Sequence, residues 1–191
     1  MIYSFIMALT KTPICDFGKK ADHFELKSIE DKIVSLNDIK GENGTLIMFI
    51  CNHCPYVKAV IKEIVSDCKE LEKEGVRSVA IMSNDTINYP DDSFDKMIEF
   101  SNDNNFNFPY LIDETQSIAK KYDAVCTPDF FGYNNNLELQ YRGRIRELKN
   151  LEPVQDGESD LLKAMKMIAK SGQGPKDQLP SMGCNIKWFK N

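Results

Sequence analysis

The stretch TLIMFICNHCPYVK, residues 45–58, joins an apolar run to two closely spaced cysteines and the start of a helical pattern. Residues 46–50 are bulky or β-branched and uncharged, which is typical of a strand buried on both faces of a parallel or mixed sheet. After Cys54, apolar residues recur at helical spacing as far as Leu71, and Gly75 suits a helix C-terminus. The stretch therefore predicts a strand, a C-x-x-C turn and a long amphipathic helix.

The two cysteines of this turn, Cys51 and Cys54, are candidate catalytic residues. The positive end of a helix dipole favours the thiolate, which is the nucleophilic form of cysteine. Pro55 is favoured at the first helical position, which makes Cys54 the N-cap and brings its sulfur closest to unpaired backbone N–H groups. This favours Cys54 as the nucleophile and Cys51 as the resolving partner, while the reverse assignment stays open. His53 is expected either to stabilise the thiolate or to be a solvated loop residue.

Length and composition indicate one domain. The chain has 191 residues, of which 42% are hydrophobic, enough for one buried core. Its net charge of −5 and the lack of a basic stripe argue against nucleic acid as a partner. Six cysteines are too few for a disulfide-dense secreted scaffold, which favours a reducing compartment. Residues 1–9 lack the features of a signal peptide, and no apolar run reaches the ~20 residues of a membrane helix, so we expect a cytoplasmic protein without a membrane part.

The rest of the chain alternates strands and helices. Residues 24–26 and 33–36 are expected to pair as a β-hairpin, and residues 77–82 to form a second central strand that completes a βαβ unit. The pattern then predicts a helix over 90–102, a strand over 108–112, a short helix to 122 with a capping box from Asp113 and Gln116, a hairpin over 129–141 and a helix capped by Ser159.

This order of elements predicts an α/β protein with a thioredoxin-like fold, in which helices flank a central mixed β-sheet that follows an N-terminal β-hairpin. Residues 1–20 would be an N-terminal arm and residues 21–170 the thioredoxin-like domain. Residues 171–191 are rich in Gly, Pro and Lys, and they are expected to form an extended C-terminal tail that packs on the domain.

Several motifs, taken in sequence order, resemble one known family. They are FICNHCPYVK at 49–58, SND at 83–85, FPYLIDETQ at 108–116, CTPDFF at 126–131, YRGR at 141–144 and PSMGCNIKW at 180–188. Over residues 20–188 the chain resembles the thioredoxin-like proteins of the alkyl hydroperoxide reductase and thiol-specific antioxidant family, in its peroxiredoxin-like branch with a Cys-Asn-His-Cys turn. The resemblance implies that the bond between Thr127 and Pro128 is cis and lies beside the cysteine turn.

The resemblance also bears on the chemistry. Counted from the strand, the attacking cysteine of thioredoxins and the peroxidatic cysteine of peroxiredoxins both fall on Cys54. Peroxiredoxins carry a Thr or Ser three residues before that cysteine, a Pro further upstream, and an arginine near the Thr-Pro element. Here Cys51 and Ile47 take the first two positions, and the arginine is missing. The sequence therefore favours disulfide exchange over efficient peroxide reduction.

Two further cysteines are candidate additional redox residues. Cys126 precedes the Thr-Pro element and is expected near the turn, either as a redox thiol or as a buried structural one. Cys184 lies in the tail. Either the tail folds back so that Cys184 acts as an additional resolving thiol, or it only packs on the domain through Ile186 and Trp188. Cys68 falls on the apolar face of the long helix and is expected in the core.

Two polar groups have open interpretations. Residues 83–85 follow a strand at its carboxyl end, where open α/β sheets bind ligands, and are expected either to line the site or to form a plain turn. Arg142, Arg144 and Arg146 alternate along a predicted strand, either as a solvated edge or as a patch for an acidic partner.

The sequence predicts a thiol–disulfide oxidoreductase that cycles a Cys51–Cys54 disulfide, with weak peroxidase (antioxidant) activity as a secondary capacity. The expected substrate is a disulfide-containing protein or a small-molecule thiol or peroxide, and the expected reductant is a thiol such as thioredoxin or glutathione. No cofactor is expected, and the chain is expected to be a monomer or a homodimer.

Two other classes of function remain open at this point. The first is a thioredoxin-fold metal-binding or metallochaperone protein, in which Cys51, Cys54, His53 and Cys126 offer soft ligands to copper or zinc. The second is an interaction module without turnover. Two cysteines at the helix start argue against that module, since one serine would abolish exchange at almost no structural cost.

Overall fold

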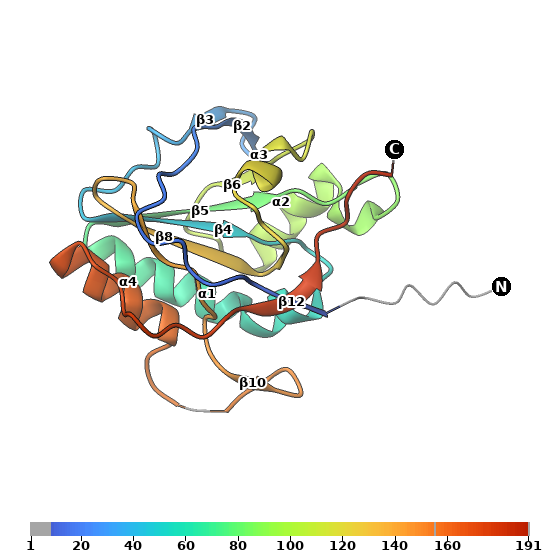
Figure 1. The fold of residues 1–191 in the computed structure, drawn as a ribbon. Coiled ribbons are helices and arrows are strands. Elements are labelled where there is room, and N and C mark those ends of the chain that lie inside the picture. Colours follow the sequence, from blue (N-terminus) through green and yellow to red (C-terminus); the bar gives the residue numbers. More distant parts are fainter. Residues whose placement is uncertain (1–8, 155, 191) are drawn as a thin grey trace.

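The computed structural model describes residues 9–154 and 156–190 (Figure 1). The expectation about a signal peptide concerns residues 1–9, and of these residues 1–8 lie outside the described part of the chain. Within the described part, a seven-stranded mixed sheet forms the centre, in the order β3-β2-β6-β5-β4-β8-β9. The predicted α/β architecture, with a central mixed sheet flanked by helices, is confirmed.

Strand β4 (Gly44–Phe49) lies in the middle of this sheet and leads to the cysteine turn. It pairs in parallel with β5 (Val76–Met82) and antiparallel with β8 (Asp129–Asn134). All of its residues are buried, because its side chains alternate between two apolar layers. The predicted pair of central strands is therefore confirmed.

Helices cover both faces of the sheet. Helices α1 (Pro55–Lys73) and α4 (Asp160–Ser171) pack on the face to which Leu46 and Met48 point, below the sheet in Figure 1. Helix α2 (Phe94–Asp103) joins the same apolar cluster, whereas α3 (Ser117–Lys121) packs on the other face with Ile47 and Phe49. The alternation of β4 thus divides the core into two clusters.

Both predicted hairpins are confirmed. Strand β2 (Glu25–Ser28) pairs with β3 (Ile33–Ser35), and β8 pairs with β9 (Leu139–Tyr141). Strand β6 (Tyr110–Ile112) joins β2 to β5. In the second hairpin the positive φ falls on Leu137, at 57°, and not on the preceding asparagines. The Asn134 side chain closes this turn by accepting two backbone N–H groups.

Two predicted helices begin differently in the structure. A short 3₁₀ helix, η1 (Pro90–Asp92), precedes α2, which begins at Phe94. The predicted capping box is wrong, because Gln116 is itself the N-cap of α3, with a φ of 59°. The carboxylate of Asp113 still accepts two backbone N–H groups of α3, at 3.1 and 2.9 Å. The polar residues at these helix starts therefore serve contacts that the local pattern does not reveal.

The C-terminal tail contains a strand that the sequence did not predict. Strand β12 (Met182–Asn185) lies between β1 (Leu9–Lys11) and β7 (Cys126–Thr127) in a separate three-stranded sheet. Both pairings are antiparallel, and Cys184 lies opposite Thr127 on one side and Leu9 on the other. Segments from the two ends of the chain therefore lie side by side (Figure 1).

The three alternating arginines do not form a solvated edge, because β9 ends before them. Each pairs with a carboxylate of the same chain: Arg142 with Asp129, Arg144 with Asp160, and Arg146 with Glu63. That prediction is wrong because these side chains hold the segment after β9 against β8, α4 and α1.

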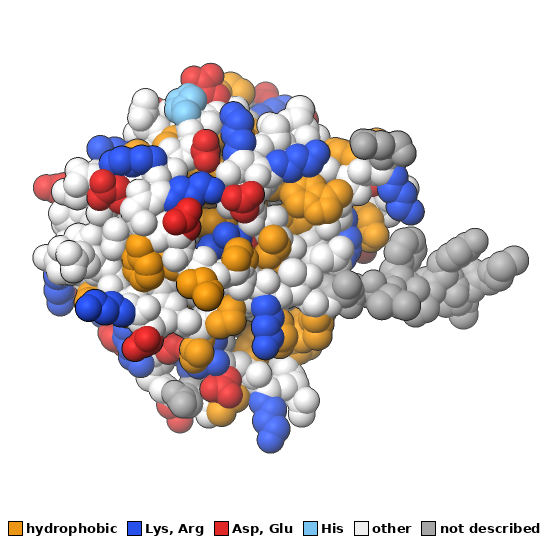
Figure 2. Space-filling view, viewed as in Figure 1, with side chains coloured by type: hydrophobic (Ala, Val, Ile, Leu, Met, Phe, Trp, Pro, Cys, Tyr) orange, Lys and Arg blue, Asp and Glu red, His pale blue; other side chains and the backbone are white. Residues whose placement is uncertain are grey.

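The remaining features are a small hairpin and a surface of mixed charge. Strands β10 (Leu148–Lys149) and β11 (Glu152–Pro153) form a small hairpin of their own. On the face drawn in Figure 2, Lys and Arg side chains are interspersed with Asp and Glu. Among the described residues, no helix has both the length and the hydropathy needed to cross a membrane.

Candidate active site

Cys54 lies at the junction of β4 and α1. It is the N-cap residue of α1, with φ −64° and ψ 123°, and Pro55 is the first helical residue. The predicted N-cap is therefore confirmed. Because an N-cap side chain lies beside unpaired N–H groups, and the dipole of the 19-residue helix adds to their effect, this position favours negative charge on sulfur.

Three thiols meet at this position. The Sγ of Cys54 lies 2.8 Å from the Sγ of Cys184 and 3.1 Å from the carbonyl oxygen of Thr127. The Sγ of Cys51 lies 3.3 Å from the Thr127 hydroxyl oxygen. Each of the three cysteines is at most 1% exposed. The structure holds them as thiols, two from the turn and one from the tail, around a single backbone segment.

The surroundings favour charge on Cys54 over the other two. Hydrogen bonds with the Cys184 and Cys51 thiols lower the pKa of Cys54 well below its ordinary value. Burial raises the pKa of Cys51, and the hydrogen bond with Cys54 raises the pKa of Cys184. As a thiolate, Cys54 accepts from Cys184; as a thiol, it donates to the Thr127 carbonyl oxygen. The geometry supports Cys54 as the nucleophile, and that role stays a prediction.

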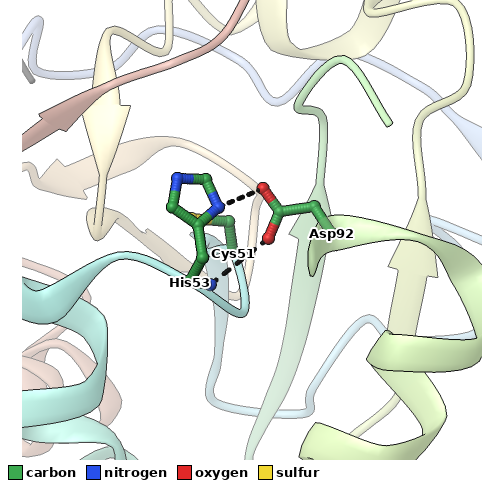
Figure 3. A group of neighbouring side chains, drawn as sticks. All are labelled: Cys51, His53 and Asp92. Atoms are coloured by element: carbon green, nitrogen blue, oxygen red, sulfur yellow. Dashed lines mark hydrogen bonds and ion pairs between the residues drawn. The ribbon is translucent and has the colours of Figure 1, made fainter. Parts of the chain in front are cut away.

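His53 is held in the turn by a carboxylate (Figure 3). Its Nδ1 lies 2.6 Å from Oδ2 of Asp92, and its ring stacks on Tyr89 with centroids 5.8 Å apart. The hydrogen bond with Asp92 outweighs the effect of burial and raises the pKa of His53, and the charge of Cys54 raises it further. His53 is therefore a fixed, half-buried side chain that favours the imidazolium form beside the sulfurs.

Asp92 is a candidate site residue that the sequence analysis missed. It is fully buried and accepts the backbone N–H of Asn52 at 2.8 Å and that of His53 at 3.3 Å. Its Oδ2 also accepts the Nδ2 of Asn84 at 2.8 Å. With the His53 ring, four donors surround this carboxylate and satisfy its hydrogen-bonding capacity in the interior.

The segment at residues 83–85 lines the site and connects it to the tail. The Oδ1 of Asn84 accepts the backbone N–H of Lys187 at 2.9 Å, and the backbone N–H of Asp85 donates to the Lys187 carbonyl at 2.8 Å. The signal in the sequence was the position of residues 83–85 at the end of β5, since the carboxyl ends of parallel strands β4 and β5 meet at one edge.

The peptide bond between Thr127 and Pro128 is cis, as the resemblance implied. Thr127 contacts the sulfurs of the turn, and the Pro128 carbonyl accepts the hydroxyl of Ser181 at 2.7 Å. The Cys126 thiol donates to the same carbonyl at 3.5 Å, and burial raises its pKa. Of the two further candidate cysteines, Cys184 is therefore the one in contact with Cys54, whereas Cys126 faces Pro128.

The other two cysteines lie in the core. Burial raises the pKa of Cys68 to about 12 and that of Cys15 to about 11. Cys68 is on the inner face of α1, as predicted. Buried thiols with raised pKa values are poor nucleophiles, so these two cysteines provide internal references for the reactivity of the site.

A pocket of about 330 Å³ adjoins the tail strand. Tyr56, Pro128 and Met182 contribute to its lining, so a small molecule bound there would lie beside the strand that carries Cys184. A larger hollow of about 780 Å³ is lined by Asn134, which pairs with Gly44 at the start of β4. That hollow therefore lies at the opposite end of the sheet from the sulfurs.

The metal-ligating groups that the structure brings together differ from the predicted set. Ligand atoms of Cys51, His53 and Asp92 all lie within 4.8 Å of one another (Figure 3). Both oxygens of Asp92 and the Nδ1 of His53 are already engaged in hydrogen bonds. Cys126, a member of the predicted set, faces Pro128. A metal ion would have to displace these bonds.

Comparisons with known proteins place this geometry in context. A family model described as the AhpC/TSA family matches residues 17–148. No curated protein matches the chain. The family match spans β2 to β9, including the cysteine turn and the Thr-Pro element, and stops short of β12.

Solved structures resemble the whole chain. An uncharacterized conserved protein from Geobacillus kaustophilus is 38% identical, with a TM-score of 0.91, over 97% of this chain and 98% of that one. A hypothetical protein from Sinorhizobium meliloti 1021 is 31% identical, with a TM-score of 0.87, over 95% and 98%. The thioredoxin domain of a thiol-disulfide oxidoreductase from Bacteroides vulgatus is 14% identical, with a TM-score of 0.57, over 70% and 89%. This last likeness confirms the predicted thioredoxin-like fold.

Proposed function

This chain belongs to the AhpC/TSA family, and from that premise we propose that it is a thiol–disulfide oxidoreductase with Cys54 as its nucleophile. Family and fold together support a thioredoxin-like redox function. The observation that carries the proposal is the Cys54 sulfur at the N-cap of α1, in hydrogen-bond contact with a second thiol. Such an environment favours the thiolate, the attacking form in disulfide exchange.

The reaction proceeds in two exchange steps. The Cys54 thiolate attacks one sulfur of a substrate disulfide, and the other substrate sulfur leaves as a thiolate. Cys51 then attacks the Cys54 sulfur of the mixed disulfide, which releases the second substrate sulfur as a thiolate, and the proton that Cys51 loses is taken up by a departing substrate thiolate. Two electrons have passed from the protein to the substrate, and a Cys51–Cys54 disulfide remains. A thiol such as thioredoxin or glutathione, in a cytoplasmic setting, returns the two electrons.

His53 and Asp92 support the first step. The imidazolium of His53 stabilises the Cys54 thiolate, since opposite charges that interact favour the ionised form of each. Asp92 is a positioning residue, because it holds the His53 ring through Nδ1 and the backbone of the turn through two N–H groups. The carboxylate thereby fixes the orientation of the turn and also favours the charged form of His53.

Weak peroxidase activity is a secondary capacity of the same site. A Cys54 thiolate that attacks hydrogen peroxide becomes a sulfenic acid and releases hydroxide, and a second thiol then condenses with it to give a disulfide and water. Cys51 replaces the hydroxyl residue that peroxiredoxins carry three positions before the attacking cysteine. For this reason we expect peroxide reduction to be slower than disulfide exchange.

Alkylation and peptide mapping test the proposal. Reduced protein treated briefly with iodoacetamide at pH 6 should carry the label on Cys54 first, since its thiolate persists at that pH. Cys68 is the internal reference for a buried, unreactive thiol. Preferential labelling of Cys51 would reverse the two roles. Equal, slow labelling of Cys54 and Cys68 would contradict the proposal.

A metal-binding or metallochaperone function remains the alternative, supported by ligand atoms of Cys51, His53 and Asp92 that lie within 4.8 Å of one another. It is tested by elemental analysis of protein purified under reducing conditions. Stoichiometric copper or zinc that is lost in a Cys51→Ser variant would favour a metallochaperone. Metal-free protein that reduces glutathione disulfide would favour exchange.

A further inference from the structure

A sulfur from outside the C-x-x-C turn lies in contact with the nucleophile. The Sγ of Cys184 lies 2.8 Å from that of Cys54, although the two residues are 130 positions apart in the sequence. This separation is longer than the ~2.05 Å of a disulfide bond, and it places the two atoms in position to form one. Cys51 contacts Cys54 as well, and it also contacts the Thr127 hydroxyl.

We propose that Cys184 is a third redox residue, and that a Cys51–Cys54 disulfide is passed on to become a Cys54–Cys184 disulfide, the resting oxidised form of the protein. The proposal rests on the function proposed above, because it needs Cys54 to be the sulfur that is oxidised first. It adds a partner for that sulfur and a second disulfide.

The strand that carries Cys184 is fixed on both sides of the cysteine. Before it, Ser181 donates its hydroxyl to the Pro128 carbonyl at 2.7 Å and its backbone N–H to the Thr12 hydroxyl at 3.0 Å, and its carbonyl accepts the backbone N–H of Thr12. After it, Ile186 is buried in the core, and the backbone of Lys187 bonds to Asn84. The contact between the two sulfurs is therefore a built part of the site, and not a chance approach of a loose tail.

Gly183 makes the close approach of this strand possible. A Cβ at this position would overlap the Thr127 carbonyl oxygen and lie 3.1 Å from the Pro128 nitrogen. The absence of a side chain lets β12 lie flat against the Thr-Pro element, so that Cys184 reaches over Thr127 to Cys54. Gly183 therefore controls the distance between two sulfurs without carrying one itself.

The transfer is an internal exchange that balances without an external oxidant. Cys184 loses its proton and attacks the Cys54 sulfur of the Cys51–Cys54 disulfide. The Cys54–Cys184 bond forms, the Cys51–Cys54 bond breaks, and Cys51 leaves as a thiolate that takes up the proton. The number of disulfides is unchanged, and Cys51 is restored to the thiol form.

Folding and the geometry of the site favour this direction of transfer. A disulfide between residues 130 positions apart restrains the unfolded chain far more than one that spans three positions, so it depends on the fold for its formation. In the folded protein, pairing of β12 with β1 and β7 holds Cys184 at 2.8 Å from Cys54, which raises the effective concentration of this thiol at the nucleophile. We therefore expect the Cys54–Cys184 disulfide to be harder to reduce than the Cys51–Cys54 disulfide.

Peptide mapping of the full-length protein distinguishes the two disulfides. Trypsin leaves Cys51 and Cys54 in one peptide, residues 41–58, and Cys184 in another, residues 177–187. After oxidation with glutathione disulfide, we expect these two peptides to be cross-linked. In Cys184→Ser, peptide 41–58 should instead carry an internal disulfide, seen as the loss of two hydrogens. The Cys68→Ser variant is the matched control and should give the wild-type map.

The Gly183→Ala variant tests the geometry while keeping every sulfur. After oxidation, the ratio of the cross-linked peptides to peptide 41–58 with an internal disulfide should be at least ~10-fold lower in this variant than in wild type. If this variant does not fold, as judged by circular dichroism, the peptide map of Cys184→Ser alone tests the relay. Oxidised wild type with only the internal disulfide would overturn the relay and leave the proposed function intact. Absence of any disulfide at Cys54 in wild type and in all variants would overturn both.

Discussion

The turn at residues 51–55 and the tail strand β12 each bring a thiol to Cys54, but by different means. In the turn, a strand end, an N-cap and a proline place Cys51 and Cys54 within one short stretch. In the tail, Cys184 is placed by pairing with β1 and β7 and by side chains from distant loops. The first arrangement is local and the second depends on the whole fold.

This difference separates two properties of Cys54. Its charge depends on both regions: the helix N-terminus and the His53–Asp92 pair act from the turn, and the hydrogen bond with the Cys184 thiol of the tail lowers its pKa. The choice of the sulfur that closes on Cys54 depends on the tail, because the position of Cys184 depends on how β12 lies. Substitutions in the turn should therefore change the reactivity of Cys54, and substitutions that loosen the tail should also change its disulfide partner.

The largest expected effect comes from Cys54→Ser, which removes the atom that both regions share. A serine hydroxyl does not ionise at neutral pH, so exchange with glutathione disulfide should fall by more than ~10³-fold. The rate is measured by intact mass as mixed disulfide and product appear. A rate close to that of wild type would show that Cys51 attacks and would contradict the assignment of Cys54 as the nucleophile.

The next effect concerns the anchor of the tail. Gln116 is buried; its Nε2 donates to the carbonyls of Ser83 and Lys187, and its Oε1 accepts the N–H of Phe189. Gln116→Ala leaves these groups without their partner, so the free energy of unfolding in urea should fall by ~2 kcal/mol. Hydrogen exchange at residues 186–189 should also accelerate.

The exposed neighbour Thr115 provides the control for this change, since Thr115→Ala removes a hydroxyl whose bond to Ser117 lies at the surface. If Gln116→Ala and Thr115→Ala had the same free energy of unfolding and the same protection from hydrogen exchange at residues 186–189, the tail would not depend on the Gln116 side chain. The contrast between a local turn and a fold-dependent tail would then lose its support.

A smaller effect is expected from Asp92→Asn, which keeps the shape of the side chain and removes its charge. The pKa of His53 should fall toward its ordinary value, because the carboxylate is the main cause of its rise. The pKa of Cys54 should rise as the imidazolium is lost, so the pH profile of its alkylation rate should shift upward. NMR titration of His53, with His23 as the reference, measures the first change. The exposed neighbour variant Asp91→Asn should alter neither.

The smallest effect is a pH dependence of stability. The folded-state pKa of His53 is raised, so its pairing with Asp92 stabilises the fold fully below the unfolded pKa of ~6.5 and loses that effect as pH rises through the folded value. The stability difference between wild type and His53→Ala should therefore be larger at pH 5.5 than at pH 8.5. Urea unfolding of the reduced proteins measures it. A difference that grew with pH would contradict the charged form of His53.

The local part of the site could be predicted from the sequence because its signals are adjacent residues. An apolar run and a proline sufficed to place β4, the N-cap Cys54 and α1. Asp92 could not be assigned in this way, since an acidic residue after a proline equally suits a helix start. Its partners, Asn84 and the turn, meet it only when the edges of β4 and β5 come together.

The alternating arginines were misinterpreted for a related reason. Alternation predicts a shared strand face only where the chain remains a strand, and β9 ends at Tyr141. Arg142 is instead buried against Asp129, whose position is set by the register of β8 with β4. Strand β12 was missed because a short segment with Gly183 at its centre has little strand character of its own.

The position of Cys184 has a consequence for the newly made protein. Cys54 and Cys184 are separated by 130 residues, which take roughly 10 s to synthesise at ~5–20 residues per second. During that interval the nascent chain holds the C-x-x-C pair without its third thiol. If the proposed relay operates, a disulfide formed so early closes between Cys51 and Cys54, and the oxidised site acquires its final form only after β12 has been made.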